Sequence, residues 1–403
     1  MAEAEPRLMR LPLAGVRILS VEQYGAGPYG TMLLAQLGAE VIKIETPGAG
    51  DTARSVGPHF LREKESLFFQ TFNLNKRSLT LDIDCAEGRA VLHRLAAGAH
   101  AVANNLRGDL PERLGLTYAR LAVANPAIVC AHLSAYGRDN SRATWPGYDY
   151  LMQAEAGYLS MTGEPDGPPV RFGLSMVDFM TGSMMCVGLL AALLDAAKTG
   201  AGRDVDVDLL STALHQTSYP ATWYLNEGDV TGRAPRSAHP SVVPSQLFRA
   251  RDGWLFVMAQ MPKFWLRLIG TMGCAEMAED PRFASPKARL ANRQVLTELL
   301  EARFQTATVA EWVDRLAGAV PVAPVYDLAG ALDNPFLAET AMIDTVAHVD
   351  RADLRVLANP IRLDGDRLPA RAAPLLGGDT DAVLAEAGFD TAEIAALRAG
   401  GVL

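Results

Sequence analysis

The sequence predicts an α/β fold, in which helices wrap a parallel sheet in a large domain and a smaller domain follows. The chain has 403 residues, which corresponds to two or three domains at about 100–200 residues each. It is 49% hydrophobic and 21% charged, so it can bury a sizeable core and lacks the composition of a disordered chain. Strand-like and helix-like stretches alternate along the first half, as parallel strands joined by helices do.

The individual elements are predicted from the spacing of apolar residues. Short apolar or alternating runs indicate strands at 16–20, 40–45, 78–83, 127–131, 205–209 and 254–259. Helical spacing indicates helices at 31–38, 87–97 and 178–198, and two more at the end of the chain, split by Gly388. A loop-like composition at 228–244, followed by mostly helical sequence at 262–317, places the small domain at 226–330. The large domain then comprises 1–225 and 331–403.

Charge and cysteine usage exclude several functions. The 37 Lys and Arg are outnumbered by 46 Asp and Glu, so a broad basic face for nucleic acid is not expected. The 4 cysteines are far apart and indicate neither a zinc site nor a disulfide framework. The first ten residues do not resemble a secretion signal, and the longest apolar run, 184–194, is shorter than the ~20 residues of a membrane helix. We therefore expect a reduced, cytoplasmic enzyme with no metal and no membrane partner.

A glycine-rich turn follows the first predicted strand. Residues 25–30 match the Gly-x-Gly-x-x-Gly pattern of dinucleotide-binding folds, and Glu45 lies about 20 residues further on, where such folds place an acid on the ribose. The alternative is a tight turn whose glycines let the strand and the helix pack closely. An NAD-dependent dehydrogenase therefore stays an alternative. No Gly-x-x-x-x-Gly-Lys-Ser/Thr sequence occurs, so a triphosphate is not bound in the P-loop manner.

Asp178 is the most informative acid. It stands where a long apolar helix begins, and Asp is among the residues preferred as a helix N-cap. The same position favours the ionised carboxylate through the helix dipole. An anionic carboxylate among apolar residues is also suited to act as a nucleophile. Both roles, cap and nucleophile, are open at this point.

Many segments, in order along the chain, resemble the family III CoA-transferases, which include formyl-CoA and carnitine CoA-transferases. The most specific is the Gly-Glu-Pro-Asp-Gly-Pro-Pro sequence at 163–169. The resemblance also covers 25–28, 41–54, 73–81, 112–116, 198–207, His239, Pro240, Pro244 and 373–377. It implies a Rossmann-like large domain, a small α+β domain, and a homodimer of two interlocked ring-shaped chains. It also reassigns Gly25, Ala26 and Gly27 to coenzyme A.

The resemblance further implies a mechanism and a set of site residues. Asp178 falls on the family's catalytic aspartate, which attacks a thioester and carries CoA as an aspartyl-CoA thioester, with no cofactor other than the CoA of the substrate. The residues that match CoA or substrate contacts are Arg54, Asn105, Leu106, Arg113, Tyr148 and His239. Gly25 replaces the Gln of some formyl-CoA transferases and Thr46 their CoA-contacting Arg, which argues against a formyl or oxalate substrate. Some members carry a glycine run near His239 that this chain lacks.

Two other functions that involve acyl-CoA remain as alternatives to CoA transfer. An α-methylacyl-CoA racemase needs a His–Asp pair, but the histidine would fall at Tyr148, and tyrosine has a pKa near 10. A non-catalytic acyl-CoA-binding protein would not need the carboxylate at Asp178. For the substrate, Arg171, Arg236 and His239 suggest a pocket for a second carboxylate, and hence a dicarboxylic acid such as succinate.

Overall fold

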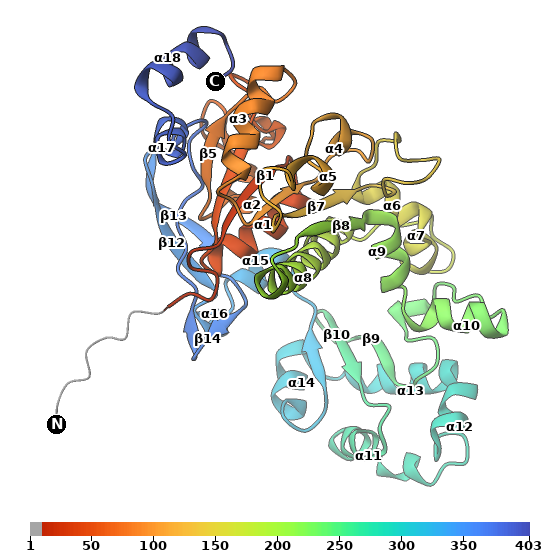
Figure 1. The fold of residues 1–403 in the computed structure, drawn as a ribbon. Coiled ribbons are helices and arrows are strands. Elements are labelled where there is room, and N and C mark those ends of the chain that lie inside the picture. Colours follow the sequence, from red (N-terminus) through yellow and green to blue (C-terminus); the bar gives the residue numbers. More distant parts are fainter. Residues whose placement is uncertain (1–9) are drawn as a thin grey trace. The chain divides into compact units, whose positions relative to one another are not determined.

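The computed structural model describes residues 10–403, which form two compact units (Figure 1). The first unit runs to Ala156 and continues through Gly173–Ser218 and Phe336–Leu403. The second consists of Gly157–Phe172 and Tyr219–Pro335. The sequence placed the small domain at 226–330 and assigned 157–172 to the large domain.

The first unit is built on a six-stranded sheet in the order β5-β2-β1-β6-β7-β8, in which all neighbouring strands are parallel. Its strands are β1 (Arg17–Val21), β2 (Glu40–Glu45), β5 (Arg77–Thr80), β6 (Ala101–Asn104), β7 (Val129–Ser134) and β8 (Arg203–Asp208). The predicted α/β class with a parallel sheet is thus confirmed. The sequence missed β6, whose four residues contain two alanines and form too short a run to show a period.

Helices cover this sheet, and small antiparallel ribbons complete the unit. The helices are α1 (Ala26–Gln36), η1 (Thr52–Ser55), α2 (Leu67–Phe72), α3 (Ala86–Ala96), α4 (Leu110–Arg113), α5 (Tyr118–Leu121), α6 (Asp149–Glu155), α8 (Met176–Thr199), α9 (Leu209–Gln216), α16 (Phe336–Thr340), α17 (Thr380–Glu386) and α18 (Thr391–Ala399). The ribbons pair β3 (Phe60–Arg62) with β4 (Glu65–Ser66), β12 (Ile343–His348) with β13 (Arg351–Leu357), and β14 (Arg362–Leu363) with β15 (Asp366–Arg367). The two terminal helices separated by Gly388 were predicted from the sequence.

Helices α1 and α8 pack at close range because both carry glycine at the contact. A Cβ on Gly30 would lie 2.7 Å from the carbonyl oxygen of Gly182, and one on Gly182 would lie 2.5 Å from that of Ala26. Both distances are too short for a side chain, so the third glycine of the 25–30 turn serves helix packing. This contact brings the start of α8 beside the start of α1.

By length and apolarity alone, α8 could cross a membrane. The helix has 24 residues, whereas the uninterrupted apolar run within it, 184–194, is shorter. In the structure it contacts α1, α9, β7 and β8. Asp178 is buried in its first turn. One side of the helix is therefore packed into the first unit, while Val187 and Leu194 on it are exposed.

The second unit has its own apolar core around Trp265 and Trp312. A three-stranded antiparallel sheet, in the order β11-β10-β9, lies with helices around it. Its elements are α7 (Tyr158–Met161), α10 (Tyr219–Glu227), η2 (Pro235–Ser237), β9 (Ser245–Arg249), β10 (Trp254–Met258), α11 (Pro262–Thr271), η3 (Ala275–Ala278), α12 (Pro286–Ala291), α13 (Arg293–Phe304), α14 (Val309–Leu316), β11 (Val322–Pro324) and α15 (Leu328–Leu332).

Candidate active site

A small cavity lies at the carboxyl edge of the sheet, where the strand order changes direction. Strands β2 and β5 lie on one side of β1, and the next strand in the sheet along the chain, β6, lies on its other side. Parallel α/β sheets bind ligands in the crevice at such a point. The cavity has a volume of about 220 Å³. It is lined by residues that follow the strands or begin helices, namely Gln23, Tyr24, Gly25, Ala26, Thr52, Asn105, Leu106, Arg107, Leu133, Ser134, Ala135, Trp145, Pro146, Gly147, Tyr148, Asp178 and Leu209.

The turn from β1 into α1 is held in place by two side chains. The amide of Asn105, directly after β6, accepts from the N–H of Gln23 at 2.8 Å and donates to its carbonyl oxygen at 2.7 Å. Asp51 accepts from the N–H of Tyr24 at 3.0 Å. Tyr24 has a φ of 69°, a left-handed conformation that costs a non-glycine residue energy, so these bonds are needed to keep it there. The turn places Gly25 and Ala26, at the start of α1, in the wall of the cavity.

A fully buried ion network lies under this turn. Lys43 contacts Asp51 at 2.8 Å and donates to the carbonyl oxygen of Glu22 at 2.9 Å. Lys76 contacts the carboxylate of Glu22 at 2.7 Å, and Thr31 donates to the same oxygen at 2.7 Å. Burial alone would raise the pKa of Asp51, but Lys43 and the N–H groups of Ala53 and Tyr24 outweigh it and lower that pKa. The network therefore keeps Asp51 ionised as an acceptor for the turn.

Asp178 enters the cavity from the first turn of α8. Ser175 is the N-cap of this helix and Asp178 is its third residue, so Asp178 is not the cap. The carboxylate that accepts a backbone N–H from the first turn of α8 is that of Asp149 on α6, which bonds to the N–H of Asp178 at 3.0 Å. Asp149 is itself held by the amide of Gln153 at 2.5 Å. A Cβ on Gly25 would lie 2.9 Å from Oδ2 of Asp178, so a side chain at residue 25 would displace this carboxylate.

The carboxylate of Asp178 has an electrostatic setting opposite to that of Asp51. It is 8% exposed, and within residues 10–403 no side chain or N–H group donates a hydrogen bond to it. Burial, together with the negative charge of Asp149, raises its pKa to about 7. We expected the helix dipole to favour the ionised form of Asp178 and so to lower its pKa. This expectation is wrong, because desolvation by burial has the larger effect and raises the pKa. The result is a carboxylate that titrates near neutral pH and is not tied to a partner.

The dinucleotide reading of the turn is contradicted by Glu45. Its carboxylate accepts from Arg54 Nε at 2.7 Å and Nη2 at 2.8 Å, and from the hydroxyl of Ser78 at 2.6 Å. It is 4% exposed, so it cannot bind a ribose hydroxyl. Gly27 is explained by packing, since a Cβ there would lie 2.8 Å from Cβ of Asn105. The glycines that fit the motif serve close contacts within the protein.

The structure brings some of the predicted site residues together and separates others. Gly25, Ala26, Asn105, Leu106, Tyr148 and Asp178 line the same cavity, and Gly27 adjoins it through Asn105. Arg113 lines a different cavity of about 360 Å³, together with Arg89, His93 and Arg120. Arg54 is fully buried between Glu45 and Glu65 and stacks on Phe69, so it does not face the cavity.

The residues proposed for a second carboxylate belong to the second unit and do not form a free basic pocket. Arg236 pairs with Glu301. The Nε2 atom of His239 lies 3.2 Å from the hydroxyl of Tyr219, and burial and Arg293 lower the pKa of His239. Arg171 lies in the segment 157–172 of the same unit. The charge of Arg236 is thus already balanced within this unit.

Sequence reasoning missed the residues that hold the site in place. Asp149, Asp51 and Lys43 are 3%, 3% and 0% exposed, although charged residues are seldom buried. Asp149 follows Tyr148 in the sequence, but nothing local indicates that it contacts the start of α8. Lys43 lies within the alternating strand 40–45, whose pattern predicts an outward-facing lysine. Because the sheet is covered on both faces, the side chain of Lys43 is buried instead.

The fold is a two-unit α/β fold, and its carboxyl-edge cavity holds the buried carboxylate of Asp178, which has no donor within residues 10–403. The model of the family described as CoA-transferase family III matches residues 13–380. The chain belongs to this family, and it is a CoA-transferase. The resemblance read from the sequence is confirmed.

Relatives with described activities match over most of their length. The chain is 33% identical over 396 residues to succinyl-CoA:glutarate CoA-transferase of Mus musculus, covering 97% of this chain and 90% of the relative. It is 32% identical over 370 residues to acetyl-CoA:oxalate CoA-transferase of Acetobacter aceti, covering 91% and 92%. A crystal structure of a CAIB/BAIF family protein from Brucella suis superposes with a TM-score of 0.82 at 31% identity, covering 94% of this chain and all of that one.

Proposed function

We propose that the protein moves CoA from an acyl-CoA thioester to a free carboxylic acid through covalent intermediates on Asp178. The observation that supports this proposal most is the setting of the Asp178 carboxylate. It lines the cavity, no donor among residues 10–403 bonds to it, and it lies against Gly25 at the start of α1. A pKa of about 7 leaves a large anionic fraction at neutral pH and gives a more basic nucleophile than an ordinary aspartate.

The proposed transfer has four steps. The Asp178 carboxylate attacks the thioester carbonyl and expels CoA thiolate, which leaves a mixed anhydride on the enzyme. The thiolate then attacks the aspartyl carbonyl, forming an aspartyl-CoA thioester and releasing the donor acid. The acceptor carboxylate attacks that thioester, and a second anhydride and thiolate form. Finally the thiolate takes the acceptor acyl group, and the Asp178 carboxylate is restored.

Each attack builds negative charge on a carbonyl oxygen, and the start of α1 can stabilise it. The first N–H groups of a helix have no partner within the helix and point out of its end. Gly25, the N-cap of α1, has no side chain to occupy them. N–H groups so arranged are typical of sites that stabilise an oxyanion. Asn105 and Asp51 would contribute by holding the turn that aims them.

CoA itself is proposed to lie along the segment that follows β6. The cavity of about 220 Å³ suits a narrow pantetheine arm passing Leu106 and Tyr148 to reach Asp178. Further along the same segment, Arg113 lines a second cavity with Arg89, His93, Glu112 and Arg120. Glu112 pairs with Arg120 at 2.7 Å, so Arg113 and Arg89 are the residues that we propose for phosphate. Arg54 is no longer among the proposed CoA contacts, since both its charged partners are carboxylates in the core.

For the donor we propose a dicarboxyl-CoA such as succinyl-CoA. The support comes from the relatives named for succinyl-CoA, and not from Arg236, whose charge is paired with Glu301. The test is exchange of CoA from succinyl-CoA to a panel of acids, followed by liquid chromatography. Asp178→Asn should abolish exchange, whereas Asp195→Asn should retain it, because Asp195 is on the same helix but half-buried, paired with Arg203 and outside the cavity lining. Equal exchange by both variants would refute a role for Asp178.

We also propose that the active form is a homodimer. The long helix α8 leaves apolar side chains uncovered, with Val187 and Leu194 each 61% exposed, and Leu214 of α9 is 49% exposed. Exposed apolar surface of this kind is typical of protein contacts. A second subunit would cover it. Sedimentation should give twice the 43.2 kDa chain mass, and an active species of single mass would contradict the proposal.

A further inference from the structure

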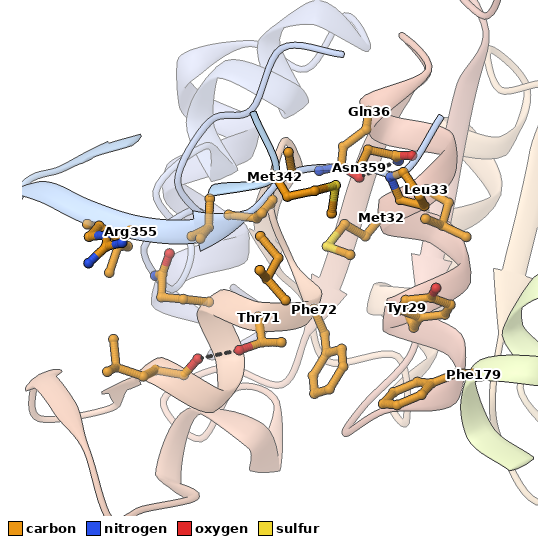
Figure 2. A pocket seen from close by; sticks show the side chains of 18 of the residues that line it. Tyr29, Met32, Leu33, Gln36, Thr71, Phe72, Phe179, Met342, Arg355 and Asn359 are labelled. Carbon is orange, nitrogen blue, oxygen red and sulfur yellow. Dashed lines mark hydrogen bonds between the residues drawn. The ribbon is translucent and has the colours of Figure 1, made fainter. Parts of the chain in front are cut away.

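A second and larger cavity lies within the first unit and shares no lining residue with the cavity of Asp178. It has a volume of about 580 Å³, within the range of small-molecule sites. Its walls come from α1, α2, the start of α8 and the β12–β13 ribbon (Figure 2). The transfer of CoA proposed above makes no use of this cavity, so its lining calls for a separate explanation.

The interior of this cavity is mainly apolar. Met32 of α1, Phe72 of α2, Phe179 of α8 and Leu354 of β13 are among the residues that line it. Figure 2 shows Phe72 and Phe179 together at one end. Walls of this kind favour a hydrocarbon chain, because moving a methylene group from water to an apolar surface is favourable.

The charge of the lining is positive. Arg351 and Arg355 of β13 line the cavity and are exposed, and no Asp or Glu stands among the described residues that line it. Arg351 contacts Asp353 at 3.4 Å, an exposed pair of little strength. The guanidinium of Arg355 has no ion pair or hydrogen bond within residues 10–403. In a chain with a net charge of −9, this local reversal of sign favours an anion.

One buried donor in the lining lacks an acceptor. Gln70 of α2 is 2% exposed, and its Oε1 accepts from the N–H of Ala373 at 2.9 Å. Its Nε2 has no hydrogen-bond partner in the part of the chain that the structure describes. By contrast, Asn359 and Gln36, which also line the cavity, bond to each other at 2.7 Å. A buried donor without an acceptor costs free energy, and an oxygen atom of a bound molecule would remove that cost.

We propose that this cavity is a second ligand site, which binds a free medium- or long-chain carboxylic acid as a ligand and not as a substrate. The hydrocarbon chain lies among the apolar walls, and the carboxylate lies toward the donors of Arg355 and Gln70. Because the linings of the two cavities are separate, this site and the cavity of Asp178 are filled independently.

Titration calorimetry on the intact enzyme without any acyl-CoA tests the proposal, because no transfer can occur when no thioester is present. Hexanoate, octanoate and decanoate should bind one per chain, and each added methylene should lower Kd about threefold to fourfold until the cavity is filled. Decanol has the same chain without the charge and should bind more weakly than decanoate by up to about fivefold. Decanoate that binds no better than hexanoate, or decanol that binds as tightly as decanoate, would overturn the proposal.

Variants of the lining test whether the acid lies in this cavity. Met342→Trp adds a large ring to the lining and should weaken decanoate binding at least tenfold. Val123→Trp adds the same ring at a residue that is 90% exposed, and should leave binding unchanged. Arg355→Gln, at an exposed residue whose replacement does not disturb the core, should remove the preference for decanoate over decanol. Binding of decanoate that neither Met342→Trp nor Arg355→Gln changes would place the acid elsewhere and overturn the proposal.

The remaining outcomes separate this site from the cavity of Asp178 and from a subunit contact. Saturating Asp178→Asn with succinyl-CoA should leave the Kd of decanoate unchanged, and a higher Kd would show that the two ligands share one cavity. A parent enzyme that binds no decanoate, as expected if a second subunit fills the cavity, would also overturn the proposal. Loss of CoA exchange with decanoate binding retained would refute the transfer function alone.

Discussion

Two buried aspartates on opposite sides of the same turn differ in almost every physical respect. Asp51 has Lys43 at 2.8 Å and accepts two backbone N–H groups, and its pKa lies below the usual value. Asp178 has no donor among the described residues and another carboxylate beside it, and its pKa rises to about 7. The first aspartate holds the backbone in place, while the second lacks such bonds among the described residues and is the nucleophile that we propose.

The comparison contrasts a carboxylate that stabilises the turn with one that we propose to react. A buried charge with no partner costs free energy, and such groups persist where surrounding structure fixes them. Here the fixed surroundings are the Asn105 and Asp51 bonds to the turn and the Asp149 contact with the start of α8. Substitutions on the two sides should therefore change stability in opposite directions.

The largest expected effect on stability comes from removing the cation beside Asp51. Lys43→Met leaves the Asp51 carboxylate buried without its charge partner, and breaking such a pair costs about 3–5 kcal/mol. Denaturant unfolding of the purified protein measures this loss. An unchanged unfolding midpoint would show that Lys43 does not stabilise the Asp51 carboxylate, and the two aspartates would then not differ as described.

Asp178→Asn should change stability in the opposite direction. Because the folded pKa of Asp178 is raised, its contribution is full below the unfolded pKa near 4 and is lost as the pH rises through about 7. At pH 8 the neutral amide avoids this cost, so the variant should be more stable than the parent, by at most about 4 kcal/mol. The difference should shrink toward pH 4. Equal stability at both pH values would mean that the carboxylate is not desolvated.

Gly25→Ala tests the close approach of the turn to the carboxylate. The new methyl group would lie 2.9 Å from Asp178 Oδ2 and must displace it. A displacement of about 1 Å can reduce a rate by about 100-fold, so transfer should fall by one to two orders of magnitude while the protein stays folded. Gly270→Ala is the matched control, since nothing lies within 4 Å of its added Cβ. Full activity in Gly25→Ala would place the reacting carboxylate elsewhere.

Near neutral pH, the smallest expected effect is the pH dependence of the parent enzyme. The profile of kcat/KM reports groups of the free enzyme. If ionised Asp178 is the nucleophile, kcat/KM for the acyl-CoA should be constant above about pH 8 and fall about tenfold per pH unit well below 7. A profile that stays flat down to pH 5 would indicate an ordinary aspartate. Retention of the same midpoint in the Asp195→Asn variant is the control.

The sequence predicted most of the fold because apolar periodicity marks long buried elements. The strand at 40–45 and the helices at 87–97 and 178–198 were placed to within one or two residues of β2, α3 and α8. Strand β6 was missed, although it carries Asn104 and leads to Asn105. A four-residue strand buried on both faces shows no alternation, so no local pattern marks it.

The site was only partly predictable, for a different reason. Asp178 and the glycines were found through a family resemblance, which relies on order along the chain. The contacts that define the chemistry join residues far apart in sequence, such as Asp149 with Asp178 and Lys43 with Asp51. Arg54 illustrates the limit, because an arginine expected to meet phosphate is instead enclosed by Glu45 and Glu65. Whether such a charged side chain faces a ligand or the core depends on segments that are distant in sequence, and the local sequence does not reveal it.

The covalent role of Asp178 is tested most directly by trapping the enzyme after the first half of the reaction. Enzyme mixed with succinyl-CoA, without an acceptor, is treated with hydroxylamine, digested and examined by mass spectrometry. The peptide that contains Asp178 should carry a hydroxamate, and the label should be absent from Asp178→Asn and present in Asp195→Asn. A label on Asp149 or on any other residue, or no label in an enzyme that still exchanges CoA, would contradict the mechanism.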